Sequence, residues 1–361
     1  MTPVTPSSAA REQEETTEVV ADPAGTSTET STETSTETTA ESSTGSSNGT
    51  TPAPTRRPRP VAVPLGLLKA MRPRQWVKNI LVLAAPFAAG RLFDLTVLPD
   101  VALAFVAFSL AASGVYLIND TKDVEADRAH PKKKYRPIAA GIVPPALAVV
   151  TGIVLFAGAL GVSLLADPDL LLVTAIYIVV QLAYCLWLKH EPVIDICIVS
   201  SGFLMRAIAG GAAAGLPLSP WFLLTMAFGS LFMASGKRYA EMRLAERTGA
   251  KIRKSLERYS ASYLRFVWSL SATVVIMAYG LWAFGIGVTA TPGRMPTSPS
   301  TWAIVSIVPF VVAILRYAVD VDGGNGGEPE EIVLGDRVLQ VLGLVWVALI
   351  GLAVYFAPGM A

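Results

Sequence analysis

A dense group of acidic residues stands at the end of a long apolar stretch, in the run from Asn119 to Asp127, which reads NDTKDVEAD. On a helix, Asn119, Asp123 and Asp127 would lie on one face, with Asp120 flanking it. Carboxylates this close repel each other unless a cation joins them. Mg²⁺ takes few carboxylates and completes its coordination with water and phosphate oxygens. We therefore predict that Asp120, Asp123 and Asp127 bind Mg²⁺ and a diphosphate, with Asn119 as a ligand or as a group that orients a carboxylate.

The plain alternative for this group is an exposed acidic helix end. It explains poorly why the acids begin inside the apolar stretch, where ionisable side chains are costly and usually functional. A basic run follows directly, and its Lys132, Lys134, Tyr135 and Arg136 are candidates for substrate binding. Ammonium and guanidinium groups beside a metal suit a polyphosphate. The same basic run also serves as a topology signal.

A second group of polar residues occupies the run from Gly236 to Glu241, which reads GKRYAE. Lys237 and Arg238 suit phosphate oxygens, Arg through its planar fork and Lys as a point charge. Tyr239 and Glu241 suit a sugar hydroxyl or a second metal. The alternative is an ordinary amphipathic helix on the membrane surface.

The first apolar segment opens with the run from Arg72 to Asn79, which reads RPRQWVKN. Arg72 and Trp76 are typical of interfacial anchors. Arg74, Lys78 and Asn79 are predicted to bind substrate, because Lys78 and Asn79 reach a turn further into the apolar region.

Three more ionisable residues lie at or inside the fifth apolar segment. Lys189, just before it, either snorkels to lipid headgroups or faces a phosphate. Asp195 and Arg206, within it, either pair with each other or line a cavity.

These groups need a scaffold, and the composition indicates a membrane. The chain has 361 residues, of which 52% are hydrophobic and 16% are charged, against about 25% charged in soluble domains. A bilayer span needs about 20 mainly apolar residues. Nine segments approach or meet that length, at about residues 75–92, 98–119, 144–165, 169–188, 193–214, 219–236, 264–286, 301–319 and 336–357. The sequence therefore predicts an all-α polytopic membrane protein with nine transmembrane helices, and a short interfacial helix over 64–73.

The N-terminal sixty residues differ from the rest. They repeat Ser, Thr and Glu, then Pro and Arg, and contain nine acidic and four basic residues. Such a composition cannot bury enough apolar surface to fold, and it lacks the apolar region of a signal peptide. We expect a disordered cytoplasmic tail over 1–60 and a nine-helix catalytic domain over 61–361. The two cysteines both lie in apolar segments, which does not support a disulfide framework or a Cys zinc site.

The placement of Lys and Arg predicts the orientation. The loops after the second and sixth segments are rich in both residues, whereas the opposite-side loops contain only Arg91 and Arg294. We therefore expect a multi-pass protein of the plasma membrane, with the N-terminus and the active site cytoplasmic and the C-terminus outside.

These motifs carry a resemblance to a known family. The entry run from Arg72 to Asn79 and the acidic run from Asn119 to Asp127 resemble the UbiA superfamily of intramembrane prenyltransferases, over about residues 64–357. Most members carry a second Asp-rich cluster after the sixth span. Here that position reads GKRYAE, and with the segments at 246–256 and 263–268 it resembles the phosphoribosyltransferases of the superfamily that act on polyprenyl phosphates.

The resemblance implies a reaction and its partners. The enzyme would be Mg²⁺-dependent and would transfer 5-phosphoribose from phosphoribosyl diphosphate to decaprenyl phosphate, for cell-wall arabinan synthesis. Membrane lipids are expected partners, nucleic acid is not, and a homo-oligomer stays open. The alternative within the family is the joining of a polyprenyl diphosphate to an aromatic acceptor. A transporter is a rival from another class, with inverted repeats and broken helices near the midplane as its signature. Here the charged groups lie at one membrane face, which suits an enzyme with a cytosolic substrate.

Overall fold

The computed structural model describes residues 62–249, 256–288, 300–323 and 329–356. These residues form helices and loops with no strand among them, which confirms the all-α prediction. The α-helices are α1 Ala62–Ala70, α2 Ala84–Ala88, α3 Leu98–Lys122, α4 Val124–Ala129, α5 Pro145–Ala166, α6 Pro168–Leu186, α7 Ile194–Ala213, α8 Pro220–Thr248, α9 Ala261–Gly285, α10 Thr301–Asp322, α11 Pro329–Gly335 and α12 Arg337–Tyr355. Three 3₁₀ helices join them: η1 Pro73–Leu83, η2 Lys133–Tyr135 and η3 Leu188–His190.

Local sequence signals set many of these boundaries. Proline occupies the first or second position of α3, α5, α6 and α8, where its missing N–H has no helical partner to lose. Asp167, Ser260 and Asp336 cap α6, α9 and α12 through side-chain oxygens that accept backbone N–H groups. The predicted tail, residues 1–60, lies outside the described residues.

Seven helices in the described part of the chain are long and apolar enough to cross a membrane, namely α3, α5, α6, α7, α9, α10 and α12. The other two predicted spans fall on η1 with α2 and on α8, which do not meet that criterion. The first is divided into short pieces, and the second, α8, continues into the polar run from Lys237 onwards. The count of nine therefore stays a prediction.

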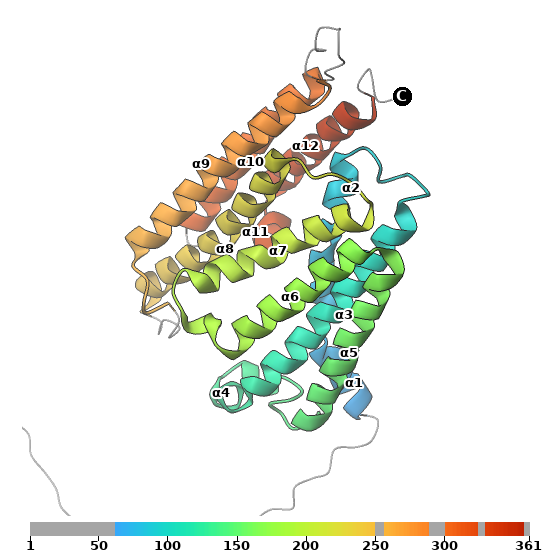
Figure 1. Cartoon of the computed structure of the whole chain (residues 1–361). Coiled ribbons are helices and arrows are strands. Elements are labelled where there is room, and N and C mark those ends of the chain that lie inside the picture. The colour runs from blue at the N-terminus through green and yellow to red at the C-terminus, as the bar shows by residue number, and fades with distance from the viewer. Residues whose placement is uncertain (1–61, 250–255, 289–299, 324–328, 357–361) are drawn as a thin grey trace, which may run out of the picture. The chain divides into compact units, whose positions relative to one another are not determined.

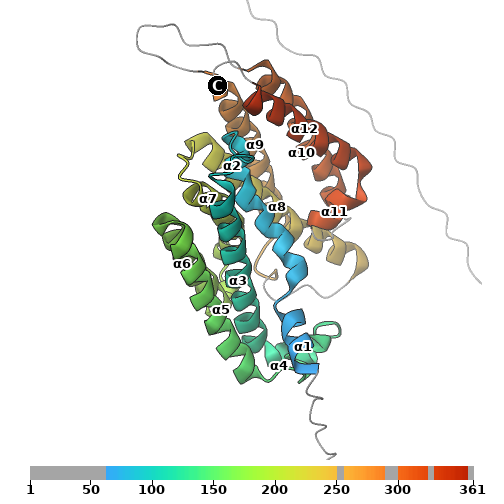
Figure 2. The ribbon, with the colours of Figure 1, turned by 90° about the vertical axis from the view of Figure 1, so that its right-hand side faces the viewer.

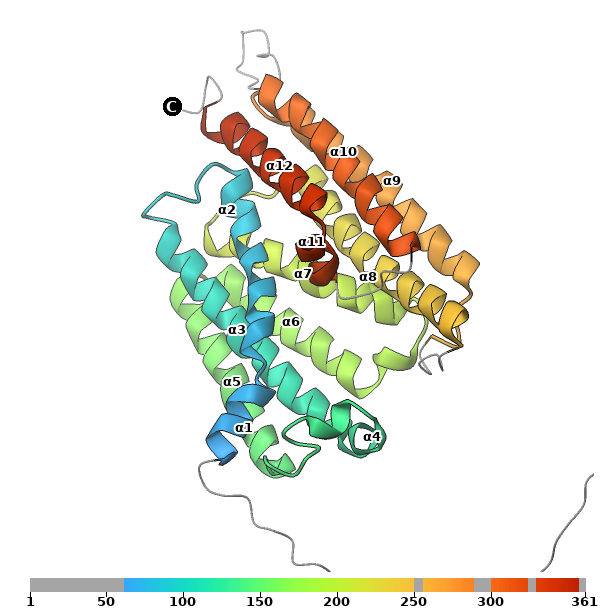
Figure 3. The ribbon, with the colours of Figure 1, turned by 180° about the vertical axis from the view of Figure 1, so that it is seen from behind.

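The helices belong to one unit, residues 56–361, and pack mostly on their sequence neighbours (Figure 1). α3 packs on α5, α8 on α9 and α10 on α12, and α12 also reaches α2 (Figure 3). α1 and α4 lie at one end of this unit, where α3 ends (Figure 2). At the other end, Tyr355 of α12 accepts the N–H of Leu92, which follows α2.

The first predicted span departs from a regular helix. Arg72 has φ 56° and ψ 60°, in the left-handed region, and the next eleven residues form η1. η1 packs against α3 and α7. Gly210 of α7 makes the approach possible, because a Cβ there would lie 1.8 Å from the carbonyl oxygen of Val82. The absence of a side chain at Gly210 thus determines where η1 sits.

Candidate active site

The acidic run does not continue as one helix. α3 ends at Lys122, Asp123 stands between two helices with φ −92° and ψ 9°, and α4 begins at Val124. This break turns α4 so that Asp127 returns toward Asp120, and both carboxylates are about 2% exposed. The predicted face of Asn119, Asp123 and Asp127 is therefore replaced by a pair, Asp120 and Asp127.

One guanidinium joins that pair. Arg136 Nη1 lies 3.1 Å from Asp120 Oδ1 and 2.6 Å from Asp127 Oδ2. Arg72 Nη2 approaches both oxygens of Asp120, at 2.8 and 3.0 Å, and its guanidinium carbon lies 4.8 Å from the centre of the Tyr116 ring. Lys133 Nζ is 3.9 Å from Asp127 Oδ1. The left-handed backbone at Arg72 lets a residue at the start of the first span reach the end of α3.

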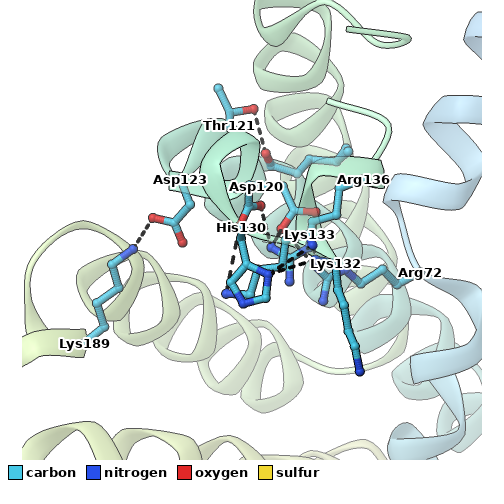
Figure 4. A network of polar contacts seen from close by, with 11 residues as sticks. Arg72, Asp120, Thr121, Asp123, His130, Lys132, Lys133, Arg136 and Lys189 are labelled. Atoms are coloured by element: carbon cyan, nitrogen blue, oxygen red, sulfur yellow. Dashed lines mark hydrogen bonds and ion pairs between the residues drawn. The ribbon is translucent and has the colours of Figure 1, made fainter. Parts of the chain in front are cut away.

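Asp123 points elsewhere and pairs with Lys189 of η3 (Figure 4). We call the full set the first cluster. It consists of Arg72, Asp120, Asp123, Asp127, Lys133, Arg136 and Lys189, in which four cations face three carboxylates. Such a group has one net positive charge and favours an anionic ligand.

The donor chemistry fits a hard cation in part. Asp120 and Asp127 already converge on one cationic atom, Arg136 Nη1, and Mg²⁺ commonly uses one or two carboxylates together with substrate phosphates. Among the described residues, however, no three acidic, histidine or cysteine side chains gather closely enough to hold a metal by themselves. Asp120 and Asp127 are thus the residues best placed for Mg²⁺, and Asp123 lies apart on Lys189.

A second set of charges surrounds Asp195, at the start of α7. Asp195 is about 2% exposed, and its Oδ2 lies 3.5 Å from Arg238 Nη2 of α8. Arg238 Nη1 lies 3.7 Å from Glu241 Oε2. No group in the described residues makes a hydrogen bond to Asp195 Oδ2. We call Asp195, Arg238, Glu241 and Tyr259 the second cluster.

Tyr259 orients Asp195. Its hydroxyl donates to Asp195 Oδ1 and accepts the N–H of Val193 at 2.5 Å. Burial, and then the Asp195 carboxylate, raise the pKa of Tyr259 well above its usual value, so the hydroxyl keeps its proton at neutral pH. Val193 has φ 70° and ψ −51°, a conformation that costs a β-branched residue on the order of 1–3 kcal/mol. Tyr259 therefore helps to hold a strained turn as well as a carboxylate.

The two clusters are neighbours. The loop from Trp187 to Val193 carries Lys189, which binds Asp123, and ends at Val193, which binds Tyr259. On the last turn of α6, Cys185 lies near Asp120 and Asp123, and Tyr184 lies near Arg238 and Asp195. The loop from Trp187 to Val193 and the last turn of α6 therefore lie between the two clusters and contact both.

Other predicted site residues are distributed around these clusters. Asn119 is half-buried and Lys237 lies beside Arg238, whereas Arg74, Lys132, Lys134 and Tyr135 are exposed. Lys78 is half-buried on η1. Tyr239 is buried and its hydroxyl donates to Asp322 of α10 at 2.8 Å, so it faces α10 rather than Arg238.

Asn79 lies in a separate polar network inside the helical unit. Its Oδ1 accepts from Arg206 Nε at 2.7 Å and its Nδ2 donates to Ser109 at 2.9 Å. Arg206 also donates to the carbonyl of Gly202 at 2.5 Å and to the hydroxyl of Tyr177 at 3.3 Å. Asp195 and Arg206 therefore do not pair with each other.

Sequence reasoning missed two contacts within these clusters, Arg72 with Asp120 and Tyr259 with Asp195, and a third contact outside them, Tyr239 with Asp322. The sequence suggests an interfacial anchor at Arg72, but Arg72 Nη2 donates to both carboxylate oxygens of Asp120. Tyr259 and Asp322 carry no local pattern that distinguishes them from other polar loop and helix-end residues. Only the fold brings them to Asp195 and Tyr239.

Comparison with known proteins gives close relatives. The chain is 61% identical over 296 residues to the decaprenyl-phosphate phosphoribosyltransferase of Mycolicibacterium smegmatis, covering 81% of this chain and 93% of the relative. It is 56% identical to the protein of the same name in Corynebacterium glutamicum, over 81% of this chain and 88% of the relative.

Solved structures agree in fold. A UbiA homologue from Archaeoglobus fulgidus, bound to DMAPP and Mg²⁺, superposes with a TM-score of 0.60 at 15% identity, covering 81% of this chain and 99% of that structure. A digeranylgeranylglyceryl phosphate synthase superposes with a TM-score of 0.57. The model of the UbiA prenyltransferase family matches residues 80–320. This chain belongs to the UbiA prenyltransferase family.

Proposed function

We propose that the protein transfers 5-phosphoribose from phosphoribosyl diphosphate to decaprenyl phosphate and releases diphosphate. The observation that carries the proposal is the identity of 56–61%, over about four fifths of the chain, to enzymes named decaprenyl-phosphate phosphoribosyltransferase. The product would supply cell-wall arabinan synthesis. The protein would be a multi-pass plasma-membrane enzyme with both clusters at the cytoplasmic face, where the soluble donor is available.

The first cluster is suited to the diphosphate of the donor. Arg72 and Arg136, which lie on carboxylates in this structure, are the cations that would bind its phosphate oxygens. Mg²⁺ held by Asp120 and Asp127 would offset the charge that develops on the departing diphosphate. Asp123 would join them only on release from Lys189. Asn119 would orient one of these carboxylates, and Lys132, Lys134 and Tyr135 would line the approach of the donor.

The reaction itself is a displacement at the anomeric carbon. The bond from that carbon to diphosphate breaks while a bond to an oxygen of the lipid phosphate forms. The acceptor is already anionic near pH 7, so no strong general base is needed, and catalysis rests on positioning and charge stabilisation. Attack from the face opposite the diphosphate predicts inversion of configuration.

The remaining predicted residues are assigned by their position. Arg74 and Lys78, at the start of η1, and Lys189 would bring the lipid phosphate into line, and Asn79 supports η1 from inside. Lys237 would hold the 5-phosphate end of the donor, and Glu241 a hydroxyl or a metal. Arg238, which pairs with Asp195 and Glu241, and Tyr239, which donates to Asp322, would support that end without binding phosphate themselves. The decaprenyl chain would lie against the apolar, lipid-facing helices.

The test is a reaction with defined components. Purified full-length protein in detergent is mixed with labelled phosphoribosyl diphosphate, decaprenyl phosphate and Mg²⁺, and the lipid fraction is analysed. We expect a phosphoribosyl lipid that depends on Mg²⁺, and none with the Asp120→Asn variant. A parallel reaction offers decaprenyl diphosphate and an aromatic acid. Product in that reaction alone would show that the protein is an aromatic prenyltransferase instead.

A further inference from the structure

Asp195 is a buried carboxylate with an unused acceptor. Its Oδ1 accepts the hydrogen bond of Tyr259, while its Oδ2 has an ion pair with Arg238 at 3.5 Å and no hydrogen bond. Buried carboxylate oxygens normally accept at least one hydrogen bond. Tyr259 has already used its single proton, and Arg238 divides its charge between Asp195 and Glu241. A donor from outside the described residues would therefore satisfy Oδ2.

The charge around this oxygen indicates what kind of donor it accepts. Asp195, Glu241 and Arg238 together carry one net negative charge, so a phosphate placed against Asp195 would meet repulsion. A neutral hydroxyl can donate to the carboxylate without that cost. Asp195 Oδ2 is itself buried, so a hydroxyl reaches it only when a neighbouring side chain shifts; those of Arg238 and Glu241 are 14% and 21% exposed.

The position of Asp195 relates this acceptor to the donor substrate. The loop from Trp187 to Val193 connects Lys189, in the first cluster, to Tyr259, in the second. If the first cluster holds the diphosphate, a sugar ring attached to it lies within reach of neighbouring groups. The second cluster differs from the first in charge sign and in having an unused acceptor, which suits the part of the donor that carries hydroxyls.

We infer that Asp195 accepts a hydrogen bond from a ring hydroxyl of the pentose donor, through Oδ2, and so contributes to selection of a hydroxylated sugar. The inference rests on the proposed function. Arg238 balances the charge of Asp195 and Tyr259 fixes its orientation, so both act as positioning residues for this contact.

The experiment compares donors and variants together. The steady-state kcat/KM is measured with phosphoribosyl diphosphate and with its 2-deoxy and 3-deoxy analogues, using the parent protein and the Asp195→Asn variant. We expect at least one analogue to react about 10- to 100-fold less well than the full donor with the parent, because a hydrogen bond to a charged group is lost. With Asp195→Asn, that penalty falls to a few-fold. For each protein, kcat/KM with the full donor is divided by kcat/KM with the analogue. Dividing the parent's ratio by that of the variant then cancels the intrinsic reactivity of the analogue.

Matched variants separate a contact from a general defect. Glu191→Gln changes a half-exposed carboxylate of the same loop, paired with Arg258, and should keep the parent's penalty. A purely structural role of Asp195 would lower kcat/KM equally for all donors, which would overturn the inference. A penalty that disappears in Glu241→Gln but persists in Asp195→Asn would overturn it as well, because the hydroxyl would then bind Glu241.

Two checks keep the result interpretable. Heat stabilisation by phosphoribosyl diphosphate shows that each variant is folded. If Asp195→Asn does not fold, Asp195→Glu keeps the charge next to Arg238 but displaces the oxygens, and the same loss of the penalty is expected. Turnover of the full donor by the parent is measured first. Its absence would refute the proposed function, whereas turnover without the expected coupling would refute only the role of Asp195.

Discussion

Asp120 and Asp195 are carboxylates at the same end of neighbouring helices, and both are about 2% exposed. Asp120 contacts two guanidinium groups at 2.8 to 3.1 Å. Asp195 has one guanidinium at 3.5 Å and shares it with Glu241. The first cluster has an excess of cations, and the second has an excess of carboxylates.

This difference indicates how one donor could be recognised at two ends. Cations that already lie on carboxylates can move to phosphate oxygens at little cost in desolvation, since they are partly buried before the substrate arrives. A carboxylate with an unused oxygen suits a hydroxyl and disfavours a second phosphate. The two clusters together would give the donor one orientation.

The largest effect is expected at the first cluster. Asp120→Asn removes the charge that holds Arg72 and Arg136 and weakens the proposed metal site. We expect kcat/KM to fall about 100- to 1,000-fold, the size typical of a lost electrostatic contact in an active site. The phosphoribosyl-lipid assay checks this result, with thermal unfolding in detergent to confirm the fold. Full activity in this variant would refute the role of Asp120 in binding Mg²⁺.

The next prediction compares the clusters directly through inhibition by the product diphosphate. Arg136→Gln removes a cation from the first cluster, so its inhibition constant for diphosphate should rise about tenfold or more, the value of a charge-assisted hydrogen bond. Asp195→Asn should leave that constant within about twofold, since a hydrogen-bonded hydroxyl is absent from diphosphate. Equal changes in both variants would contradict the division between a phosphate site and a hydroxyl site.

The sequence predicts the helices well because their signals are local. Apolar length places α3, α5, α6, α7, α9, α10 and α12, and proline, Asp167 and Asp336 mark where helices start. The first span is predicted less well. Its 3₁₀ geometry depends on the backbone of Arg72 and on the contact between Gly210 and Val82, and neither is visible in an apolar pattern.

The candidate site shows the same limit. The acidic and basic runs could be found because their residues are close in sequence. The partners Arg72 and Lys189 come from segments 48 and 66 residues away from Asp120 and Asp123. Tyr259 is 64 residues from Asp195. A helical repeat also suggested that Asn119, Asp123 and Asp127 share a face, whereas the break at Asp123 brings Asp127 to Asp120.

A smaller effect, on stability, is expected from substitution of Asn79, which belongs to a buried polar network without a carboxylate. Arg206 is buried there, and no described carboxylate lies within salt-bridge distance, so Asn79, Gly202 and Tyr177 satisfy it. Asn79→Leu would leave Arg206 Nε without its partner and should lower the free energy of unfolding by about 1–3 kcal/mol. Thermal unfolding in detergent measures this loss. Ser109→Ala, on the other side of Asn79, should cost less, and the reverse order would contradict the assignment.

The smallest effect is expected at Asp94, an ion-paired carboxylate in the loop between α2 and α3, far from both clusters. Hydrogen bonds from Thr96 and Arg91 lower the pKa of Asp94 to about 2, below its value of about 4 in unfolded chains. Its contribution to stability is therefore present above about pH 4 and is lost as the pH falls toward 2. Asp94→Asn should slightly flatten the fall of Tm over that range, since exposed pairs contribute little, and should leave activity at pH 7 unchanged. A loss of activity in this variant would contradict the view that only carboxylates within the two clusters contribute to catalysis.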